Sequence, residues 1–203
     1  MNSYVFEQTI NENHIGGTES ENVIFTHCVK RALQQNNNQS VNTVEIGILN
    51  GERCSHFLNI DPNVKHIGID PIVPDSMESS LIGNIQIIEK NTNFAKDRFT
   101  FINDYCEKPS VVNLIENDSI DFLFIDGDHN YEAVKRDFNL YYDKVKCNRY
   151  IGIHDSRMYR NGARFHPGPS KFTDELLSGI YKQYSLKLVA EAWSLTVFEK
   201  LSK

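Results

Sequence analysis

The segment from Ile120 to Tyr131 joins a run of apolar residues to a group of polar side chains that could do chemistry. The apolar run is typical of a strand buried on both faces, and Asp126, Asp128 and His129 follow it around a glycine. Carboxylates and imidazoles can hold a divalent cation or accept a proton, and a buried strand needs none of them for packing. Because open α/β sheets bind ligands just beyond the carboxyl ends of their strands, the sequence predicts a functional site here.

A second polar pair, His154 and Asp155, follows the next predicted strand. Neighbouring parallel strands lie about 4.8 Å apart, so Asp126 and this pair can reach one cation. Carboxylate ligands favour Mg²⁺ or Ca²⁺, whereas histidine ligands shift the preference toward Mn²⁺, Fe²⁺ or Zn²⁺. The alternative roles are structural: Asp128 would cap the following helix, and His129 would pack on its first turn.

The segment from Glu45 to Gly51 has the context of a nucleotide-binding loop, because it lies between a predicted strand and a predicted helix. Glycines such as Gly47 and Gly51 allow a sharp turn and a close approach of the backbone to a ligand. Asp70 stands nineteen residues after Gly51, where an acid can accept hydrogen bonds from ribose hydroxyls. Together these residues indicate an adenosine-containing ligand; the alternative is an ordinary strand–helix turn with a capping acid.

Strands alternate with helices along the chain. We predict strands at 41–46, 66–70, 99–102, 120–125, 150–153, 186–190 and 193–198, and helices at 20–35, 52–60, within 82–95, at 110–116, from 131 and at 171–184. In the helix from 131, Asp137 is expected to face outward. This alternation is typical of the doubly wound α/β class, a mostly parallel sheet with right-handed crossovers. We expect one domain over residues 1–203, with an N-terminal arm and helix in 1–40 and the core in 41–203.

Composition and charge narrow the class of function. A net charge of −6 argues against a nucleic-acid backbone or an anionic membrane surface as the main partner. No stretch approaches the roughly 20 apolar residues that span a bilayer. The four cysteines form no C-x-x-C pair, and without a secretory leader we expect reduced thiols and a cytoplasmic location.

Three segments together resemble the class I S-adenosylmethionine-dependent methyltransferases: 44–51, 122–131 and 151–155. The resemblance is strongest to the branch with a strand-end DGDHxY signature, which includes macrocin-type sugar O-methyltransferases and relatives of the catechol type. It implies a seven-stranded Rossmann-like sheet with an antiparallel last strand and helices on both faces. It also implies methyl transfer from S-adenosylmethionine to a hydroxyl of a small molecule, with a sugar or glycoside among the candidate acceptors.

The resemblance implies a role for each matching residue on the cofactor side. Glu45 and Gly47 would line the methionine part of S-adenosylmethionine, Asp70 the ribose, and Asp104 with Tyr105 the adenine. Arg53 stands where relatives often have a small hydroxyl residue, so Thr18 or Ser20 could help to hold the carboxylate of the cofactor. The full predicted cofactor set is Glu45, Gly47, Gly51, Asp70, Asp104, Tyr105 and Asp126.

On the acceptor side, the resemblance implies that Asp126, His154 and Asp155 hold Mg²⁺ or another divalent cation. His154 replaces a carboxylate of the relatives, so the identity of the metal stays open. Asp128 matches the proposed general base, and His129 is the alternative if it faces the cleft. Arg157, Tyr159, Arg160, Arg164 and His166 are expected either to border the acceptor pocket or to form a solvated loop.

The sequence is also compatible with two other functions. The chain could be a non-catalytic module that binds S-adenosylmethionine or a metal. It could also be an NAD-dependent oxidoreductase, against which the missing G-x-G-x-x-G motif argues. The oligomeric state, a homo-oligomer included, is not readable. Five histidines lack partners at an informative spacing and are expected to be structural: His14, His27, His56, His66 and His166.

Overall fold

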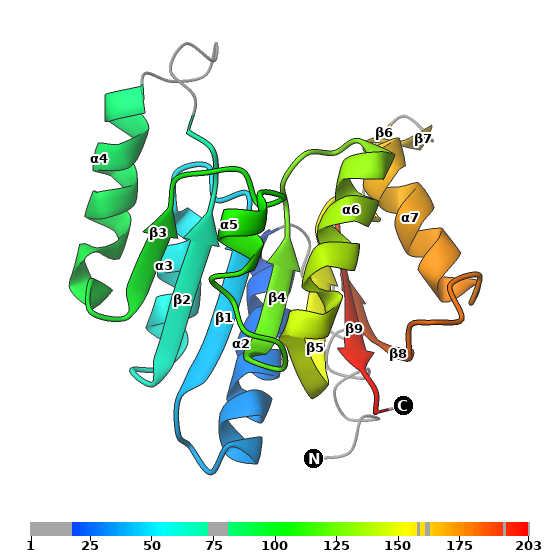
Figure 1. Cartoon of the computed structure of the whole chain (residues 1–203), viewed down its shortest axis with the longest axis horizontal. Coiled ribbons are helices and arrows are strands. Elements are labelled where there is room, and N and C mark those ends of the chain that lie inside the picture. The colour runs from blue at the N-terminus through cyan, green and yellow to red at the C-terminus, as the bar shows by residue number, and fades with distance from the viewer. Residues whose placement is uncertain (1–17, 73–80, 158, 161–162, 193, 203) are drawn as a thin grey trace.

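The structure is a computed structural model that describes residues 18–72, 81–157, 159–160, 163–192 and 194–202. Its centre is a seven-stranded sheet in the order β3-β2-β1-β4-β5-β9-β8, in which β9 runs antiparallel to both of its neighbours. The doubly wound class and the antiparallel last strand are therefore confirmed (Figure 1). The strands of this sheet are β1 (Val41–Ile46), β2 (Val64–Ile69), β3 (Phe99–Ile102), β4 (Ile120–Ile125), β5 (Val145–Ile153), β8 (Leu186–Ala192) and β9 (Leu195–Lys200).

Helices cover both faces of the sheet, with α2 and α3 on one face and α6 and α7 on the other (Figure 1). A small two-stranded sheet of β6 (Tyr159–Arg160) and β7 (Ala163–Arg164) precedes α7. The helices are α2 (Thr18–Gln35), α3 (Glu52–Ile60), α4 (Leu81–Thr92), α5 (Pro109–Val112), α6 (Tyr131–Tyr141) and α7 (Pro167–Leu177), and short 3-10 turns follow α4 (Asn93–Ala95) and α6 (Tyr142–Lys144).

Strand β4 lies at the middle of the sheet and is buried along its whole length. Successive side chains of a strand point to opposite faces, and β4 divides its apolar residues accordingly. Phe122 and Phe124 pack in the cluster that contains Phe25 of α2. Leu123 and Ile125 pack in the cluster on the other face. Two apolar layers thus hold the end of β4 in place, and the predicted site follows directly after it.

The predicted bounds of β1, α3, β3 and β4 agree with the structure, and other elements differ at their ends. Helix α2 begins at Thr18, two residues earlier than predicted, so Ser20 lies inside the helix and is buried. Strand β5 begins at Val145 instead of 150, and α5 ends at Val112 instead of 116. Helix α7 begins earlier than predicted, at Pro167, because proline suits the first turn of a helix.

The prediction that Asp137 faces solvent was wrong. Its side chain is buried on α6 and accepts hydrogen bonds from Arg136 at 3.0 Å and from the Cys106 thiol at 3.3 Å. Burial raises the pKa of Asp137 against these stabilising contacts. Helical periodicity places a residue on a face, but the position of the loop before α5 decides whether that face is covered.

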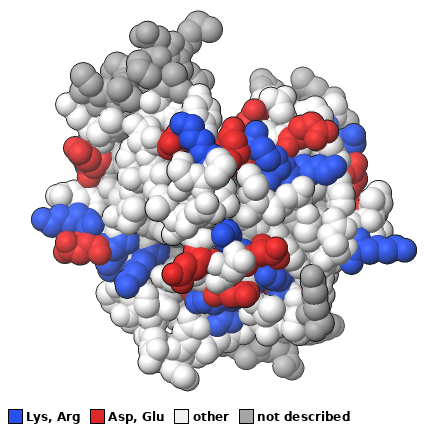
Figure 2. Space-filling model, in the orientation of Figure 1, with Lys and Arg blue, Asp and Glu red and all other residues white. Residues whose placement is uncertain are grey.

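No helix among the described residues is both long and apolar enough to cross a membrane. On the face shown in Figure 2, acidic and basic side chains lie interspersed, without a broad basic area among the described residues.

Candidate functional site

A cleft of about 700 Å³ opens at the carboxyl ends of β1, β2, β4 and β5. Parallel strands end at the same edge of a sheet, so polar residues that follow different strands converge there. Many of the predicted site residues line the cleft, namely Glu45, Gly47, Asp70, Asp126, Asp128, His129, His154 and Asp155. The remaining lining residues are Asn22, Ile48, Leu49, Asn50, Glu52, Arg53, His56 and Gly127.

The turn after β1 brings its backbone against the end of β4. Gly47 has a φ of +82°, and a Cβ atom at this position would lie 2.2 Å from the carbonyl oxygen of Asp126. Only glycine tolerates both this backbone angle and this approach. Gly51 also has a positive φ, +75°, but its Cβ would meet Ile88 at an ordinary 3.4 Å. Gly47 therefore joins the two halves of the cleft, whereas Gly51 serves the start of α3.

Asp70 fixes the shape of this turn. One carboxylate oxygen, Oδ2, accepts hydrogen bonds from the backbone N–H groups of Ile48 at 2.8 Å and Leu49 at 2.9 Å. Asp70 also lines the cleft, and no hydrogen bond from the described residues reaches its second oxygen, Oδ1, which could accept from a ligand. The acid predicted to bind ribose thus already holds the loop that would surround the cofactor.

Glu45 belongs to a buried polar group beneath the cleft. Its Oε2 accepts a hydrogen bond from the Cys54 thiol at 3.2 Å and lies 3.3 Å from Nε2 of His66. Nδ1 of His66 lies 2.7 Å from the Thr43 hydroxyl, and Phe57 stacks on the imidazole ring. Burial raises the pKa of the Cys54 thiol well above its usual value, so Cys54 stays a hydrogen-bond donor. Glu45 is thereby held in one orientation at the end of β1.

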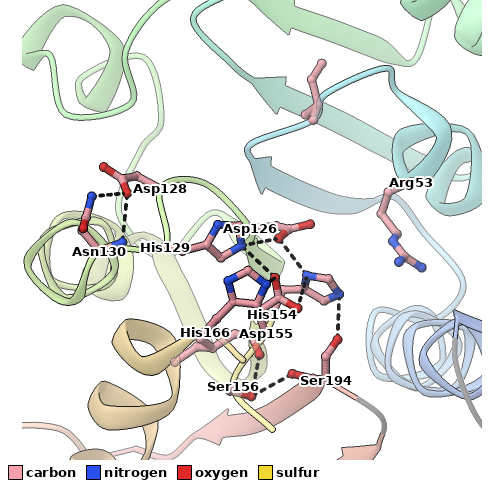
Figure 3. Close-up of polar contacts among 12 residues, drawn as sticks. Arg53, Asp126, Asp128, His129, Asn130, His154, Asp155, Ser156, His166 and Ser194 are labelled. Atoms are coloured by element: carbon pink, nitrogen blue, oxygen red, sulfur yellow. Dashed lines mark hydrogen bonds and ion pairs between the residues drawn. The ribbon is translucent and has the colours of Figure 1, made fainter. Parts of the chain in front are cut away.

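His154 contacts two carboxylates at the end of β5, those of Asp126 and Glu21. Figure 3 shows its contacts with Asp126 and Ser194. Its Nδ1 is 2.8 Å from Asp126 Oδ1, and its Nε2 is 3.3 Å from Glu21 Oε1 and 3.0 Å from the Ser194 hydroxyl. Burial alone would lower the pKa of His154, but the hydrogen bonds to Asp126 and Glu21 outweigh it and raise the pKa to about 10. At neutral pH His154 is therefore an imidazolium that donates from both ring nitrogens.

Asp155 is the meeting point of two further histidines. Its Oδ2 lies 2.7 Å from Nε2 of His129 and 3.2 Å from Nε2 of His166, and the two imidazole rings stack with centroids 4.2 Å apart (Figure 3). The hydrogen bond to Asp155 raises the pKa of His129, whereas burial lowers the pKa of His166. Burial would raise the pKa of Asp155, but the bond from His129 and the charges of His154 and His166 lower it.

Asp128 is oriented by a local turn. Its Oδ1 accepts hydrogen bonds from the backbone N–H of Asn130 at 2.9 Å and from the Asn130 side chain at 2.7 Å (Figure 3). These bonds lower the pKa of Asp128, so the carboxylate is ionised at neutral pH. Asp128 also lines the cleft while its carboxylate steadies the start of α6, so a structural role and the predicted catalytic role are compatible.

Other predicted site residues lie apart from this cleft. Asp104 pairs with Lys108 at 2.5 Å, and neither Asp104 nor the half-exposed Tyr105 is among the lining residues. Gly51 does not line the cleft either. Ser20 is buried in α2, and the side chain of Thr18 lies outside the described residues.

Arg53 and α2 close one side of the cleft. The Arg53 guanidinium donates to Asn22 at 2.7 Å and to Glu21 at 3.0 Å, and it lies over the Phe25 ring. Because Glu21 also contacts His154, it links α2 to both halves of the site. Burial alone would raise the pKa of Glu21, but the bonds from His154 and Ser194 and the charge of Arg53 lower it.

Sequence reasoning missed Glu21 and the contacts of His166. Glu21 stands one helical turn before Phe25 on the apolar stripe of α2, a spacing from which a buried acid could have been inferred. His166 has no partner at an informative spacing along the chain, but tertiary packing sets it against His129 and Asp155. No local pattern links these three residues.

The residues proposed for Mg²⁺ can be compared with what that ion needs. Three potential ligand atoms lie within 4.8 Å of one another, one each from Asp126, His154 and Asp155, which is close enough to surround an ion. Mg²⁺ prefers oxygen ligands, and both nitrogens of His154 already donate to acceptors. The donor set of these three residues therefore fits Mg²⁺ poorly.

Comparison with known proteins places this geometry in a family. A family model described as a methyltransferase domain matches residues 25–156. An uncharacterized protein of Acanthamoeba polyphaga mimivirus is 28% identical over 192 residues, covering 92% of this chain and 82% of that protein.

Solved structures share the fold at low sequence identity. A protein from Corynebacterium glutamicum superposes with a TM-score of 0.64 at 16% identity, covering 99% of this chain and 89% of the other. A candidate caffeoyl-CoA O-methyltransferase from Staphylococcus aureus has a TM-score of 0.59 at 17% identity, and the match covers 98% of this chain and 92% of that protein. The MycE methyltransferase of mycinamycin biosynthesis was solved with Mg, S-adenosylhomocysteine and mycinamycin VI. It has a TM-score of 0.58 at 17% identity, and the match covers 85% of this chain and 48% of MycE. The chain belongs to the methyltransferase domain family and has the fold of the class I S-adenosylmethionine-dependent methyltransferases.

Proposed function

We propose that this protein transfers the methyl group of S-adenosylmethionine to a hydroxyl oxygen of a small molecule, with sugars and glycosides as the first class to test. The observation that carries the proposal is one cleft lined both by the glycine turn after β1 and by the acids that follow β4 and β5. Two of the structural neighbours are named as methyltransferases: a candidate caffeoyl-CoA O-methyltransferase, and MycE, which was solved together with mycinamycin VI.

The β1–β2 side of the cleft suits the cofactor. When bound, S-adenosylmethionine supplies an electrophilic methyl group on a positively charged sulfur. Asp70 has one oxygen left for ribose hydroxyls, and Glu45 is held at the edge of the cleft where the methionine part would lie. Asp126, Asp128 and Asp155 add negative charge that favours a cationic ligand. Asp104 and Tyr105, which we propose as contacts of the adenine, do not line the cleft. The adenine would have to extend past the lining residues to reach them.

Asp128 is our choice for the general base. It is ionised at neutral pH, and Asn130 occupies its Oδ1, while among the described residues no hydrogen bond reaches Oδ2. Nε2 of His129, the alternative base, is directed at Asp155 instead. A carboxylate with a lowered pKa is a weak base, so the acceptor hydroxyl must be positioned in line with the methyl group before the proton leaves.

The proposal is tested by replacing Asp128 with Asn and measuring binding and turnover separately. We expect Asp128→Asn to lower kcat by about 100-fold or more, because general-base catalysis contributes about 10² to 10⁴. Affinity for S-adenosylhomocysteine, measured by calorimetry, should stay within a few-fold of the wild type. Turnover is followed with labelled S-adenosylmethionine and a panel of sugars, glycosides and catechols.

Asp143→Asn is the matched control, because Asp143 is an exposed acid outside the cleft and its loss should change neither quantity. Unchanged turnover in Asp128→Asn would refute the base assignment. Failure of the wild type to bind S-adenosylhomocysteine, or preferential binding of NAD⁺, would refute the proposed function as a whole.

A further inference from the structure

We propose that His129, Asp155 and His166 form a binding site for a nitrogen-preferring divalent transition metal, with Zn²⁺ as the expected ion. These residues lie at the edge of the cleft, on the side of β4 and β5. The inference goes beyond methyl transfer, because it concerns which ion the chain binds and does not depend on the acceptor.

The ligand atoms already converge. Both Nε2 atoms lie close to the same oxygen of Asp155, at 2.7 Å for His129 and 3.2 Å for His166. One donor atom of each residue lies within 4.8 Å of the others. Ligands of zinc lie about 2.0 to 2.2 Å from the ion, which corresponds to neighbouring ligand atoms slightly more than 3 Å apart. A small outward shift of the two rings would admit the ion.

The fold contains features that create this meeting point. Gly168, near the start of α7, packs so closely that a Cβ there would lie 2.1 Å from the carbonyl oxygen of His129. This approach sets His166, the residue before α7, against His129 and stacks the two rings. Asp155 has a φ of +52°, a left-handed angle that is uncommon for a non-glycine residue and is often found at functional sites.

The cluster is accessible and has room for further ligands. The side chain of His129 is 43% exposed and that of His166 is 24% exposed, whereas that of Asp155 is only 11% exposed. The three side chains would contact an ion from the protein side: a nearly buried carboxylate and two partly exposed imidazoles. The coordination positions on the solvent side would stay open for water or an acceptor oxygen. Open positions of this kind distinguish a catalytic metal site from a closed structural one.

The chemistry of the donors selects the ion. Two imidazoles and one carboxylate suit Zn²⁺, Fe²⁺, Co²⁺ or Ni²⁺, whereas Mg²⁺ prefers oxygen. The neighbouring group of Asp126, His154 and Asp155 offers carboxylates, but His154 donates from both nitrogens to Asp126 and Glu21. The group that contains His166 therefore offers the better set of donors for a nitrogen-preferring ion.

The test uses the full chain, stripped of metal with a chelator, and Co²⁺ as a spectroscopic substitute for Zn²⁺. We expect one equivalent of Co²⁺ to produce visible d–d absorption, Zn²⁺ to displace it, and Mg²⁺ to fail to displace it at a hundredfold excess. His166→Ala should weaken Co²⁺ binding by more than tenfold, since even outer-shell changes cost 10- to 100-fold. His129→Ala should do the same.

Three controls separate the possible outcomes. His56→Ala removes an imidazole that lines the cleft outside the cluster, and it should leave Co²⁺ affinity unchanged. His154→Gln should also retain binding; loss in this variant with retention in His166→Ala would put the ion on the Asp126 group and overturn the proposal. Mg²⁺ competing as well as Zn²⁺ would overturn it too. Affinity for S-adenosylhomocysteine, measured on the same samples, verifies folding and reports on the proposed function independently.

Discussion

An aspartate stands at each end of β4, and the two aspartates have different partners. At the first end, Asp121 is fully buried and accepts from Lys146 at 2.8 Å, Arg149 at 2.9 Å and the backbone N–H of Asn42 at 2.9 Å. At the other end, the side chain of Asp126 is 26% exposed, and its charged partner at 2.8 Å is a histidine.

This difference separates a structural acid from one that can take part in function. Lysine and arginine carry only hydrogen-bond donors and are poor metal ligands, so the Asp121 group is satisfied by its own partners and offers no site to another ligand. Imidazoles can lose a proton, rotate or bind a metal. The same strand therefore has a locked ionic group at one end and an exchangeable one at the other.

The largest effect on stability is expected at the locked end. Asp121→Ala would leave the buried Arg149 and the partly buried Lys146 without their carboxylate, and removal of one partner of a buried pair costs about 3 to 5 kcal/mol. Urea unfolding should show this loss, whereas folded protein should bind S-adenosylhomocysteine and Co²⁺ as before. Asp143→Ala, at an exposed acid, should change the free energy of unfolding by less than about 0.5 kcal/mol. A loss of ligand binding in folded Asp121→Ala would break the contrast between the two ends.

A somewhat smaller effect is expected where the β1 turn meets the end of β4. Gly47→Ala places a methyl group 2.2 Å from the Asp126 carbonyl oxygen at a left-handed φ, so we expect a loss of about 3 kcal/mol and weaker cofactor binding. Gly51→Ala has nearly the same φ without the clash and should cost about 1 to 2 kcal/mol. Thermal unfolding and calorimetry measure both. Equal losses would mean that the backbone angle, and not the approach to Asp126, requires glycine at position 47.

The smallest effect is a dependence of stability on pH at the exchangeable end. The folded-state pKa of His154, about 10, lies above its ordinary value of 6.5, so its contribution is complete below pH 6.5 and is lost as the pH rises through 10. We expect the wild type to lose about 2 kcal/mol between pH 7 and pH 10, less than the full shift implies because the paired carboxylates relax. Urea unfolding at a series of pH values should show a flatter profile for His154→Gln.

Asp121→Ala provides the comparison for this profile. The described contacts of Asp121 include no histidine. The difference in free energy of unfolding between Asp121→Ala and the wild type should therefore stay constant between about pH 6.5 and pH 9. A slope at Asp121 as steep as that at His154 would remove the distinction between the two ends of β4.

Local pattern was sufficient for the framework of the site. The apolar run of β4 and the glycine-bounded turn after β1 are short-range signals, and both elements have the predicted bounds. Because parallel strands end at one edge, the positions of Glu45, Asp70, Asp126 and Asp155 along the chain were enough to predict a shared cleft. Their roles in binding and catalysis stay predictions that the experiments above address.

The sequence by itself determined the order of strands and helices and the edge of the sheet at which the acids gather, because strand alternation and helical periodicity are local properties of the chain. Only the tertiary structure decided which charges meet: Asp121 with Arg149, Glu21 with His154, and His166 with Asp155. These pairs join distant elements, and close packing such as that at Gly168 sets their distances. A charge pattern read along the chain carries no information about such contacts, since their energies depend on burial and on separations of a few ångströms.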